Sequence, residues 1–470
     1  MRHSALKRLL AVPLLMVLAL VVGAPVLVSS AGAADLPKNI IIMFADGAAA
    51  TQWDFGRYSS TVLRRQPLVT TEVVFRQGVM GLLATTPHGA YVTDSAAAAS
   101  AMSTGVKVAN GAISITPDGL SPPTVMEAAK AAGKRIGLVT TATVYDATPA
   151  AFALHTKSRR DSQALVDQLL ALEPDVLMGG GSEYFLPDNA PGGKRKDGRD
   201  VIAAFRAKGH HVARNPAELA AAGSKLLALF SESDMDFEID RDPAREPTTA
   251  EMAVAALKAL EQQSPKGFVL LVENENVDTA GHQNDAASLM RALWAFDDAV
   301  TVALDFQRRH PETLVIVTGD HETGGFSPTY ALKDLSTVAS SNRFYNGDTQ
   351  LRMLERITMS FSTVQEKLGK SPSGEALDQV LAKAFPGFRL DPDLRELILG
   401  GKTDERNFSY LPHNAFGRMV ARQTGYYWGT SGHTPEPVVI GAVGPGAELF
   451  RGYQDNTDFG KHLHRLIQGK

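Results

Sequence analysis

The stretch Asn39-Ile40-Ile41-Ile42-Met43-Phe44-Ala45-Asp46 contains the pattern from which the architecture can be predicted. Its apolar residues form an unbroken run, whereas a half-exposed strand would alternate apolar and polar side chains. Unbroken runs are typical of strands that are buried on both faces of a parallel sheet. We therefore predict a strand over Asn39–Phe44, which ends just before the acidic Asp46.

Similar apolar, β-rich runs recur along the chain, and helical stretches separate them. The other predicted strands are Arg135–Thr141, Val176–Met178, Phe268–Val272, Leu314–Thr318 and Val438–Val443. The predicted helices are Ser95–Thr104, Pro123–Ala132, Arg160–Leu172, Thr248–Gln263, Asp285–Arg309 and Thr457–Ile467. This alternation predicts an α/β fold, a three-layer α/β/α sandwich with a largely parallel central sheet.

Residues 331–425 differ from the rest, with clustered charges, frequent Gly, Pro and Asn, and weaker apolar periodicity. Short helices are predicted over Gly374–Phe385 and Asp391–Leu399. We interpret this segment as an insertion or cap within one catalytic domain that spans residues 34–470, rather than as an independent domain.

The first 33 residues have the composition of a secretory signal peptide. Three basic residues precede the uncharged apolar run Leu9–Val28, and the small Ala31 and Ala33 stand at −3 and −1 of a cleavage site before Ala34. This predicts a periplasmic or secreted protein with no membrane span after cleavage. An uncleaved anchor remains an alternative, because the apolar run is long enough to span a bilayer.

Composition excludes several kinds of chemistry. The 470 residues include no cysteine, so disulfides, thiolate metal sites and cysteine nucleophiles are ruled out. Any metal must bind to oxygen and imidazole nitrogen. The net charge of −4 includes no basic excess, which argues against nucleic acid as the main partner.

Acidic residues follow four of the predicted strands. Asp46 follows the first, Asp146 and Thr148 follow Arg135–Thr141, Glu273 follows Phe268–Val272, and Asp320 and His321 follow Leu314–Thr318. Ligands of open α/β sheets bind at the carboxyl ends of the strands, where bare carboxylates would repel one another. Each residue alone is explained as a turn or capping residue, but four at corresponding positions favour a centre with divalent cations.

Two further histidines fit such a centre. Asp278 and His282 have an i, i+4 spacing, which places them on one side of a helix, and His433 lies in a Gly-rich stretch before a late strand. Mixed Asp and His ligands without Cys suit catalytic zinc.

Ser95 is the candidate nucleophile. Thr93 or Asp94 can cap a helix whose first turn holds Ser95, and the N–H groups there favour a bound phosphoryl group. No Gly-x-Ser-x-Gly pattern surrounds Ser95, so activation by zinc is a better explanation than a Ser-His-Asp triad. The alternative is that Ser95 only caps the helix. Arg159 could grip two phosphate oxygens, or be an ordinary surface arginine.

Three stretches that contain these candidate residues together resemble the bacterial alkaline phosphatases, which are metal-dependent phosphomonoesterases. They are Val92-Thr93-Asp94-Ser95-Ala96-Ala97, the stretch from Thr140-Thr141-Ala142-Thr143 through Asp146-Ala147-Thr148-Pro149-Ala150-Ala151-Phe152, and Val317-Thr318-Gly319-Asp320-His321-Glu322-Thr323-Gly324-Gly325. The resemblance extends over residues 39–330 and 426–468 and is weak between them.

This resemblance implies two Zn²⁺ ions and one Mg²⁺ ion. The implied ligands are Asp278, His282 and His433 for the first zinc, Asp46, Asp320 and His321 for the second, and Asp46, Thr148 and Glu273 for magnesium, with Asp146 near its waters. It also implies that Ser95 attacks a phosphate monoester to give a phosphoserine, that Arg159 grips the phosphate, and that the protein is a homodimer.

The chain departs from the family pattern at Thr279, where other members often carry Lys, His or Trp, and at Thr323, where many have a second histidine. Hydrolysis of phosphodiesters or sulfate esters is an alternative activity. The Cys/Ser-x-Pro-x-Arg signature of sulfatases is absent. A metal- or phosphate-binding protein without catalysis is a third alternative, which Ser95 argues against.

Overall fold

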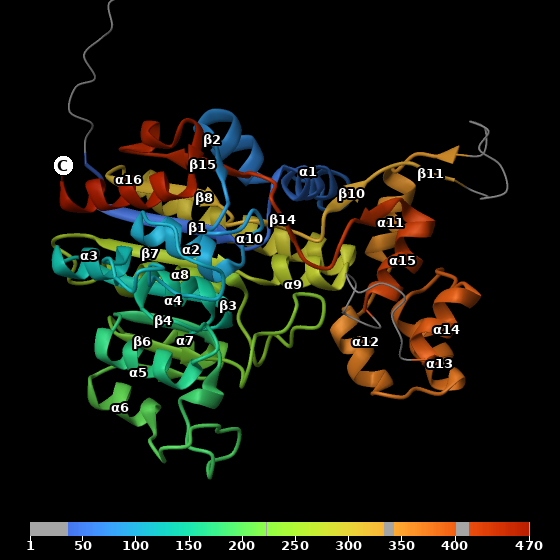
Figure 1. Ribbon diagram of the computed structural model, residues 1–470, viewed down its shortest axis with the longest axis horizontal. Coiled ribbons are helices and arrows are strands. Elements are labelled where there is room, and N and C mark those ends of the chain that lie inside the picture. The colour runs from blue at the N-terminus through green and yellow to red at the C-terminus, as the bar shows by residue number, and fades with distance from the viewer. Residues whose placement is uncertain (1–35, 222, 333–342, 401–412, 470) are drawn as a thin grey trace, which may run out of the picture. The chain divides into compact units, whose positions relative to one another are not determined.

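The computed structural model describes residues 36–469 apart from 222, 333–342 and 401–412, so the predicted signal peptide lies outside the described residues. A ten-stranded sheet with strand order β16-β2-β15-β8-β1-β7-β3-β4-β6-β5 forms its centre (Figure 1). Strand β15 is antiparallel to both of its neighbours, and every other neighbouring pair is parallel. The predicted fold class is therefore confirmed.

The strands of this sheet include all six predicted from the sequence. They are β1 (Asn39–Ala45), β2 (Val79–Ala84), β3 (Arg135–Thr143), β4 (Val176–Gly180), β5 (His211–Ala213), β6 (Leu226–Leu229), β7 (Phe268–Asn274), β8 (Thr313–Thr318), β15 (Val438–Val443) and β16 (Gly452–Asp455). The four that the sequence did not predict are the outer two strands at each end of the sheet. Strands β5, β6 and β16 have only three or four residues, and the apolar pattern of β2 is interrupted by Gly81.

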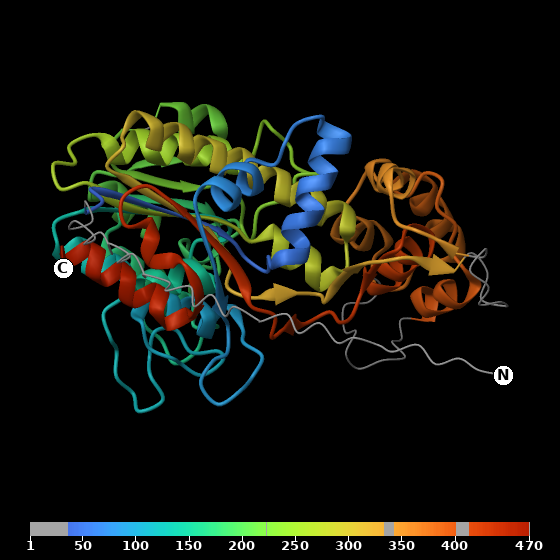
Figure 2. The same cartoon turned by 90° about the horizontal axis from the view of Figure 1, so that it is seen from above.

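Strand β1 is fully buried because helices cover both faces of the sheet. Ile41 and Met43 pack on one face, in a core built with α1 (Ala50–Ser59), α8 (Thr249–Glu261) and α10 (Ala286–Arg309). Ile40, Ile42 and Phe44 pack on the other face. The helices there are α2 (Ser95–Thr104), α3 (Val125–Ala131), α4 (Ala147–Ala153), α5 (Ser162–Leu172), α6 (Val201–Ala207) and α16 (Asn456–Gln468). In Figure 2 the sheet lies between α10, in yellow, and α16, in red.

Predicted and observed helices agree within two residues at their ends, and the differences have local causes. Thr124 caps α3 through a capping box with Glu127, so that helix begins after Thr124 rather than at Pro123. Asp285 accepts hydrogen bonds from two N–H groups at the start of α10 and is its N-cap rather than its first residue. None of the helices in the described ranges has the length and apolar character needed to cross a bilayer.

Five helices lie between the main strands β8 and β15 and gather beside α9 (Asn276–Gln283), as the orange part of Figures 1 and 2 shows. They are α11 (Asp348–Glu355), α12 (Phe361–Leu368), α13 (Gly374–Ala384), α14 (Pro392–Gly400) and α15 (His413–Thr424). Their buried side chains, among them Phe361, Leu377 and Phe416, belong to the same continuous apolar core as α8 and α10. We refer to residues 344–424, without the undescribed 401–412, as the cap segment.

The remaining elements are short. Strands β9 (Glu322–Thr323) and β14 (His433–Thr434) pair with each other, as do β10 (Phe326–Pro328) with β13 (Tyr426–Trp428) and β11 (Ala331–Leu332) with β12 (Arg343–Phe344). Helix α7 (Pro216–Ala220) precedes β6, and single turns of other helix types occur at Ser60–Arg64, Thr70–Phe75, Ser182–Tyr184 and Ala447–Phe450. The β9–β14 pair is the one that concerns function, because His433 lies in it.

Candidate metal centre

The four strands that deliver acidic residues are consecutive in the sheet, in the order β8-β1-β7-β3. Asp46 directly follows β1, Glu273 lies at the end of β7, and Asp320 follows β8 after one glycine. Because these strands are parallel, their carboxyl ends meet at one edge of the sheet. The sequence pattern thus reflects a real cluster of side chains.

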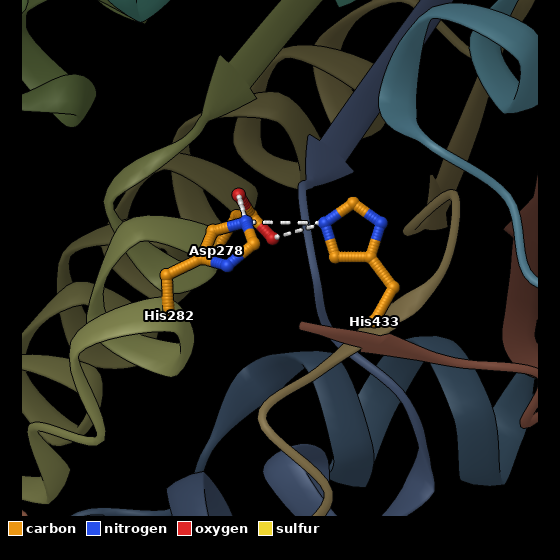
Figure 3. A group of neighbouring side chains, drawn as sticks. All are labelled: Asp278, His282 and His433. Atoms are coloured by element: carbon orange, nitrogen blue, oxygen red, sulfur yellow. Dashed lines mark hydrogen bonds and ion pairs between the residues drawn. The ribbon is translucent and has the colours of Figure 1, made fainter. Parts of the chain in front are cut away.

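Asp278, His282 and His433 form one compact group, which we call group A (Figure 3). Each offers a ligand atom within 4.8 Å of the others. His282 Nε2 lies 3.2 Å from Asp278 Oδ2 and 3.1 Å from His433 Nε2. The first two residues come from α9 at the predicted i, i+4 spacing, and His433 comes from β14.

Backbone carbonyls orient both rings of group A. His282 Nδ1 lies 2.6 Å from the carbonyl oxygen of Ser431, and His433 Nδ1 lies 2.7 Å from that of Thr93. A carbonyl only accepts, so each Nδ1 carries a hydrogen and each Nε2 faces the shared space. Two Nε2 atoms this close need a proton or a cation between them, and carbonyl-bound histidines of this kind are typical metal ligands.

Asp46, Asp320 and His321 form group B, the second of the two three-residue groups within the described residues, and all three are buried. His321 Nε2 lies 3.5 Å from Asp46 Oδ1 and 3.3 Å from Asp320 Oδ2. These two carboxylate oxygens have no hydrogen-bond partner among the described residues. Burial, followed by the electrostatic effect of the neighbouring His433, lowers the pKa of His321 well below its ordinary value, so its ring is neutral and able to bind a metal.

Thr148, Glu273 and Asp146 lie outside these two groups. In the described part of the chain, Thr148 Oγ1 and Glu273 Oε1 are buried without a hydrogen-bond partner, while Glu273 Oε2 accepts a 2.5 Å bond from Thr140. Oxygen donors of this kind suit a hard cation. Asp146 instead forms an ion pair with Arg159.

Ser95 is the first residue of α2, and Asp94 is the N-cap: its side chain accepts a hydrogen bond from the N–H of Ala97. The alternative that Ser95 itself caps the helix is therefore wrong. Ser95 is 4% exposed, and its Oγ lies 3.1 Å from His321 Nε2, beside group B.

Arg159 is anchored rather than free at the surface. Its guanidinium lies 3.2 Å from Asp146 and 3.5 Å from Asp94, the two residues that precede α4 and α2. Although burial opposes the charge, these carboxylates raise the pKa of Arg159 above its ordinary value. Arg159, Asp94 and Asp146 line one surface hollow with Gly111 and Ser158.

The same architecture is found in a known family. The alkaline phosphatase family model matches residues 37–468. The chain belongs to the alkaline phosphatase family. It is 31% identical to alkaline phosphatase 3 of Bacillus subtilis, over 93% of this chain and 90% of that protein. The family confirms the resemblance found in the sequence.

Solved structures of alkaline phosphatases match the fold of this chain. The Thermus thermophilus alkaline phosphatase matches with a TM-score of 0.81 and 30% identity, over 93% of this chain and 94% of that one. The cold-active enzyme from Shewanella matches with a TM-score of 0.73 at the same identity, over 91% and 99%. This alkaline phosphatase is thus a phosphoric monoester hydrolase, and its family implies divalent metal ions.

The sequence analysis missed Glu322, which links the segments that carry groups A and B. Its side chain is 1% exposed and accepts four hydrogen bonds. The donors are Gln52 Nε2 at 2.6 Å, Thr434 Oγ1 at 2.7 Å, and the N–H groups of Gly325 and Phe326 at 3.0 Å. Glu322 directly follows His321, and Thr434 directly follows His433. Four donors on one carboxylate therefore fix the positions of both histidines, and no local pattern marks Glu322 as special.

Thr323 joins the two groups directly. Its hydroxyl donates to Asp278 Oδ1 and lies 3.2 Å from His321 Nδ1. A hydroxyl can donate to one and accept from the other, which leaves His321 Nε2 directed toward Ser95. Thr323 therefore takes over an orienting position where many family members carry histidine.

We expect Glu322→Gln to destabilise the protein by about 1–3 kcal/mol. Each carboxylate oxygen of Glu322 accepts from two donors, and an amide has only one oxygen, so two of the four donors would lose their acceptor. Urea unfolding of the metal-loaded variant measures this. The control is Glu396→Gln on the exposed face of α14, which should match the wild type. Equal stability of the two variants would contradict the role given to Glu322.

Without cations, three of the buried acids, Asp46, Asp320 and Glu273, have raised pKa values and bind protons more readily than free carboxyl groups. Burial and neighbouring carboxylates raise the pKa of Asp46 well above its ordinary value, and burial is the main cause that raises the pKa of Asp320 to about 7 and of Glu273 to about 8. Although burial opposes it, Asp278 raises the pKa of His282 to about 9.

These shifts predict how stability depends on pH after metal removal. An acid whose folded pKa is raised stabilises the protein below its unfolded pKa of about 4, and this contribution is lost as pH rises through the folded pKa. We expect the Tm of chelated protein to fall by on the order of 5–10 °C between pH 5 and pH 8. The metal-loaded protein should change less, and parallel curves for the two forms would contradict the prediction.

Proposed function

We propose that this alkaline phosphatase hydrolyses phosphate monoesters through a phosphoserine at Ser95, with two Zn²⁺ ions and one Mg²⁺ ion as cofactors. The observation that carries the proposal is the position of Ser95. Its hydroxyl lies at the N-terminus of α2, 3.1 Å from a neutral imidazole within a buried group of carboxylates.

The donor sets support the choice of metals. Group A would hold the first zinc and group B the second, since imidazole with carboxylate is a typical ligand set for catalytic zinc. Asp46, Thr148 and Glu273 offer only oxygen, as magnesium prefers, and Asp146 would bind its waters. When bound, these cations would lower the pKa of the Ser95 hydroxyl and withdraw charge from the phosphoryl oxygens.

The residues of the chain then have separate tasks. Arg159 would grip two phosphoryl oxygens, and its two carboxylate partners hold it in place. Ser95 loses its proton to solvent, and its Oγ attacks phosphorus as the bond to the alcohol breaks. The alcohol leaves with a proton from water. The dipole of α2 stabilises the phosphoryl group on Ser95. Water then attacks phosphorus, the bond to Oγ breaks, and Ser95 regains its proton as phosphate leaves.

We expect Ser95→Ala to lower kcat for a chromogenic monoester by at least about 10³-fold while zinc content stays unchanged. Acid-quenched wild-type protein given radiolabelled substrate should carry phosphoserine at position 95. A parallel assay with the matching diester and a sulfate ester tests the alternatives. Near-native turnover of the variant, or rates on the diester equal to those on the monoester, would overturn the proposal.

Thr279 supplies a second prediction. Its hydroxyl donates to Glu275, a carboxylate near Asp146, and family members often carry a cation at this position. We expect Thr279→Lys to lower the inhibition constant of phosphate by about two- to fivefold, because a lysine there would attract the phosphate anion. The effect is small because the lysine would be partly exposed to solvent. Thr279→Met is the control for size. If lysine and methionine give the same constant, charge at this position does not matter.

We also propose that the protein is exported by cleavage of residues 1–33 and that it is a homodimer. The basic and apolar composition of the first residues supports export, and the family resemblance supports the dimer. N-terminal sequencing of the mature protein and its sedimentation coefficient test these two statements separately.

A further inference from the structure

The turn between α9 and α10 is the point where the cap segment meets group A. Three residues directly follow His282 there: Gln283, which ends α9, Asn284, and Asp285, which caps α10. Gln283 exchanges hydrogen bonds with Ser362 of α12, at 2.8 and 3.1 Å. Asp285, which caps α10, also accepts from the N–H of Phe361 at 3.0 Å. Gln283 and Asp285, the two residues that flank Asn284, are thus both hydrogen-bonded to the N-terminus of α12.

Asn284, the middle residue, faces the opposite way, toward the loop that carries His433. It is 3% exposed and has a left-handed backbone with φ of 59°. Its amide Nδ2 donates to the carbonyl oxygen of Gly281 at 3.0 Å and to that of Thr430 at 2.9 Å. The next carbonyl, that of Ser431, is the one that accepts from His282. Two successive carbonyls of the 430–433 loop are therefore bound by the last turn of α9.

Helix α15 of the cap segment packs directly on Asn284. A Cβ atom at Gly417 would lie 2.7 Å from Cβ of Asn284 and 2.9 Å from its carbonyl oxygen, so only glycine fits there. Asn284 is thereby enclosed between α15, the end of α9 and Thr430. Its amide has little freedom to turn elsewhere.

We propose that Asn284 is a positioning residue through which the cap segment sets the separation of His282 and His433, and hence how tightly group A holds its metal. The two histidines are 151 positions apart in the chain, and their Nε2 atoms must stay close for one ion to bind both. The tether from Asn284 to Thr430 links the two segments beside the ligands themselves. This inference rests on group A being a metal site, as proposed above.

Asn284→Gly removes the tether without straining the backbone, because glycine adopts the left-handed conformation freely and lacks the whole carboxamide side chain. We expect zinc to leave group A of this variant about 10- to 100-fold faster in a chelator assay, the range seen when partners of metal ligands are removed. The absorption spectrum of Co²⁺ bound at group A should change as well, which a general loss of stability would not produce.

Gly417→Ala tests the contribution of the cap segment while Asn284 itself stays unchanged. Its added methyl group would press against Asn284, so it should accelerate metal loss as well. Its matched control is Gly400→Ala in α14, where an added methyl group has no neighbour within 4 Å among the described residues. That control should release zinc at the wild-type rate.

His282→Ala separates failure of this inference from failure of the metal site. If His282→Ala loses the metal but Asn284→Gly and Gly417→Ala release it at the wild-type rate, the coupling is absent and the metal site stands. If His282→Ala keeps the metal as well as the wild type, the metal site is wrong and the inference fails with it.

Discussion

Repulsion among buried carboxylates is the constraint on which the rest of this structure depends. Asp46, Asp320 and Glu273 end neighbouring parallel strands, and burial raises the pKa of each of them. A fold that buries several carboxyl groups side by side is stable at neutral pH only if protons or cations neutralise their charge. Divalent ions would neutralise this charge and would also supply the Lewis acid that phosphoryl transfer needs. The same ions would therefore serve both the stability of the fold and catalysis.

The surrounding elements hold the acids in place despite that repulsion. Glu322 uses four donors to fix the residues next to His321 and His433, and Thr323 connects Asp278 with His321. Asn284 connects the last turn of α9 with the loop before His433. The proposed ligand residues are thus supported by hydrogen bonds that extend into the cap segment, consistent with the geometric precision that metal sites require.

Much of this could be predicted from the sequence because the relevant signals are local. An unbroken apolar run followed by an acid predicts both a buried strand and a residue at its carboxyl end, and the spacing of Asp278 and His282 predicts a shared helix face. The short edge strands β5 and β16 lack such a signal. Glu322 and Asn284 could not be found, because their roles arise from contacts with residues 112 and 146 positions away. Ser95 was ambiguous until Asp94 proved to be the cap.

The most direct test of the central constraint is the number of protons released when Zn²⁺ and Mg²⁺ bind to the metal-free protein. Calorimetric titration near pH 7 in buffers of different ionisation enthalpy measures it. If buried acids and His282 hold protons in place of cations, binding must expel them, and more than one proton should be released per chain. Metal binding with no proton release would contradict the account, because the carboxylates would then be ionised before any cation arrives.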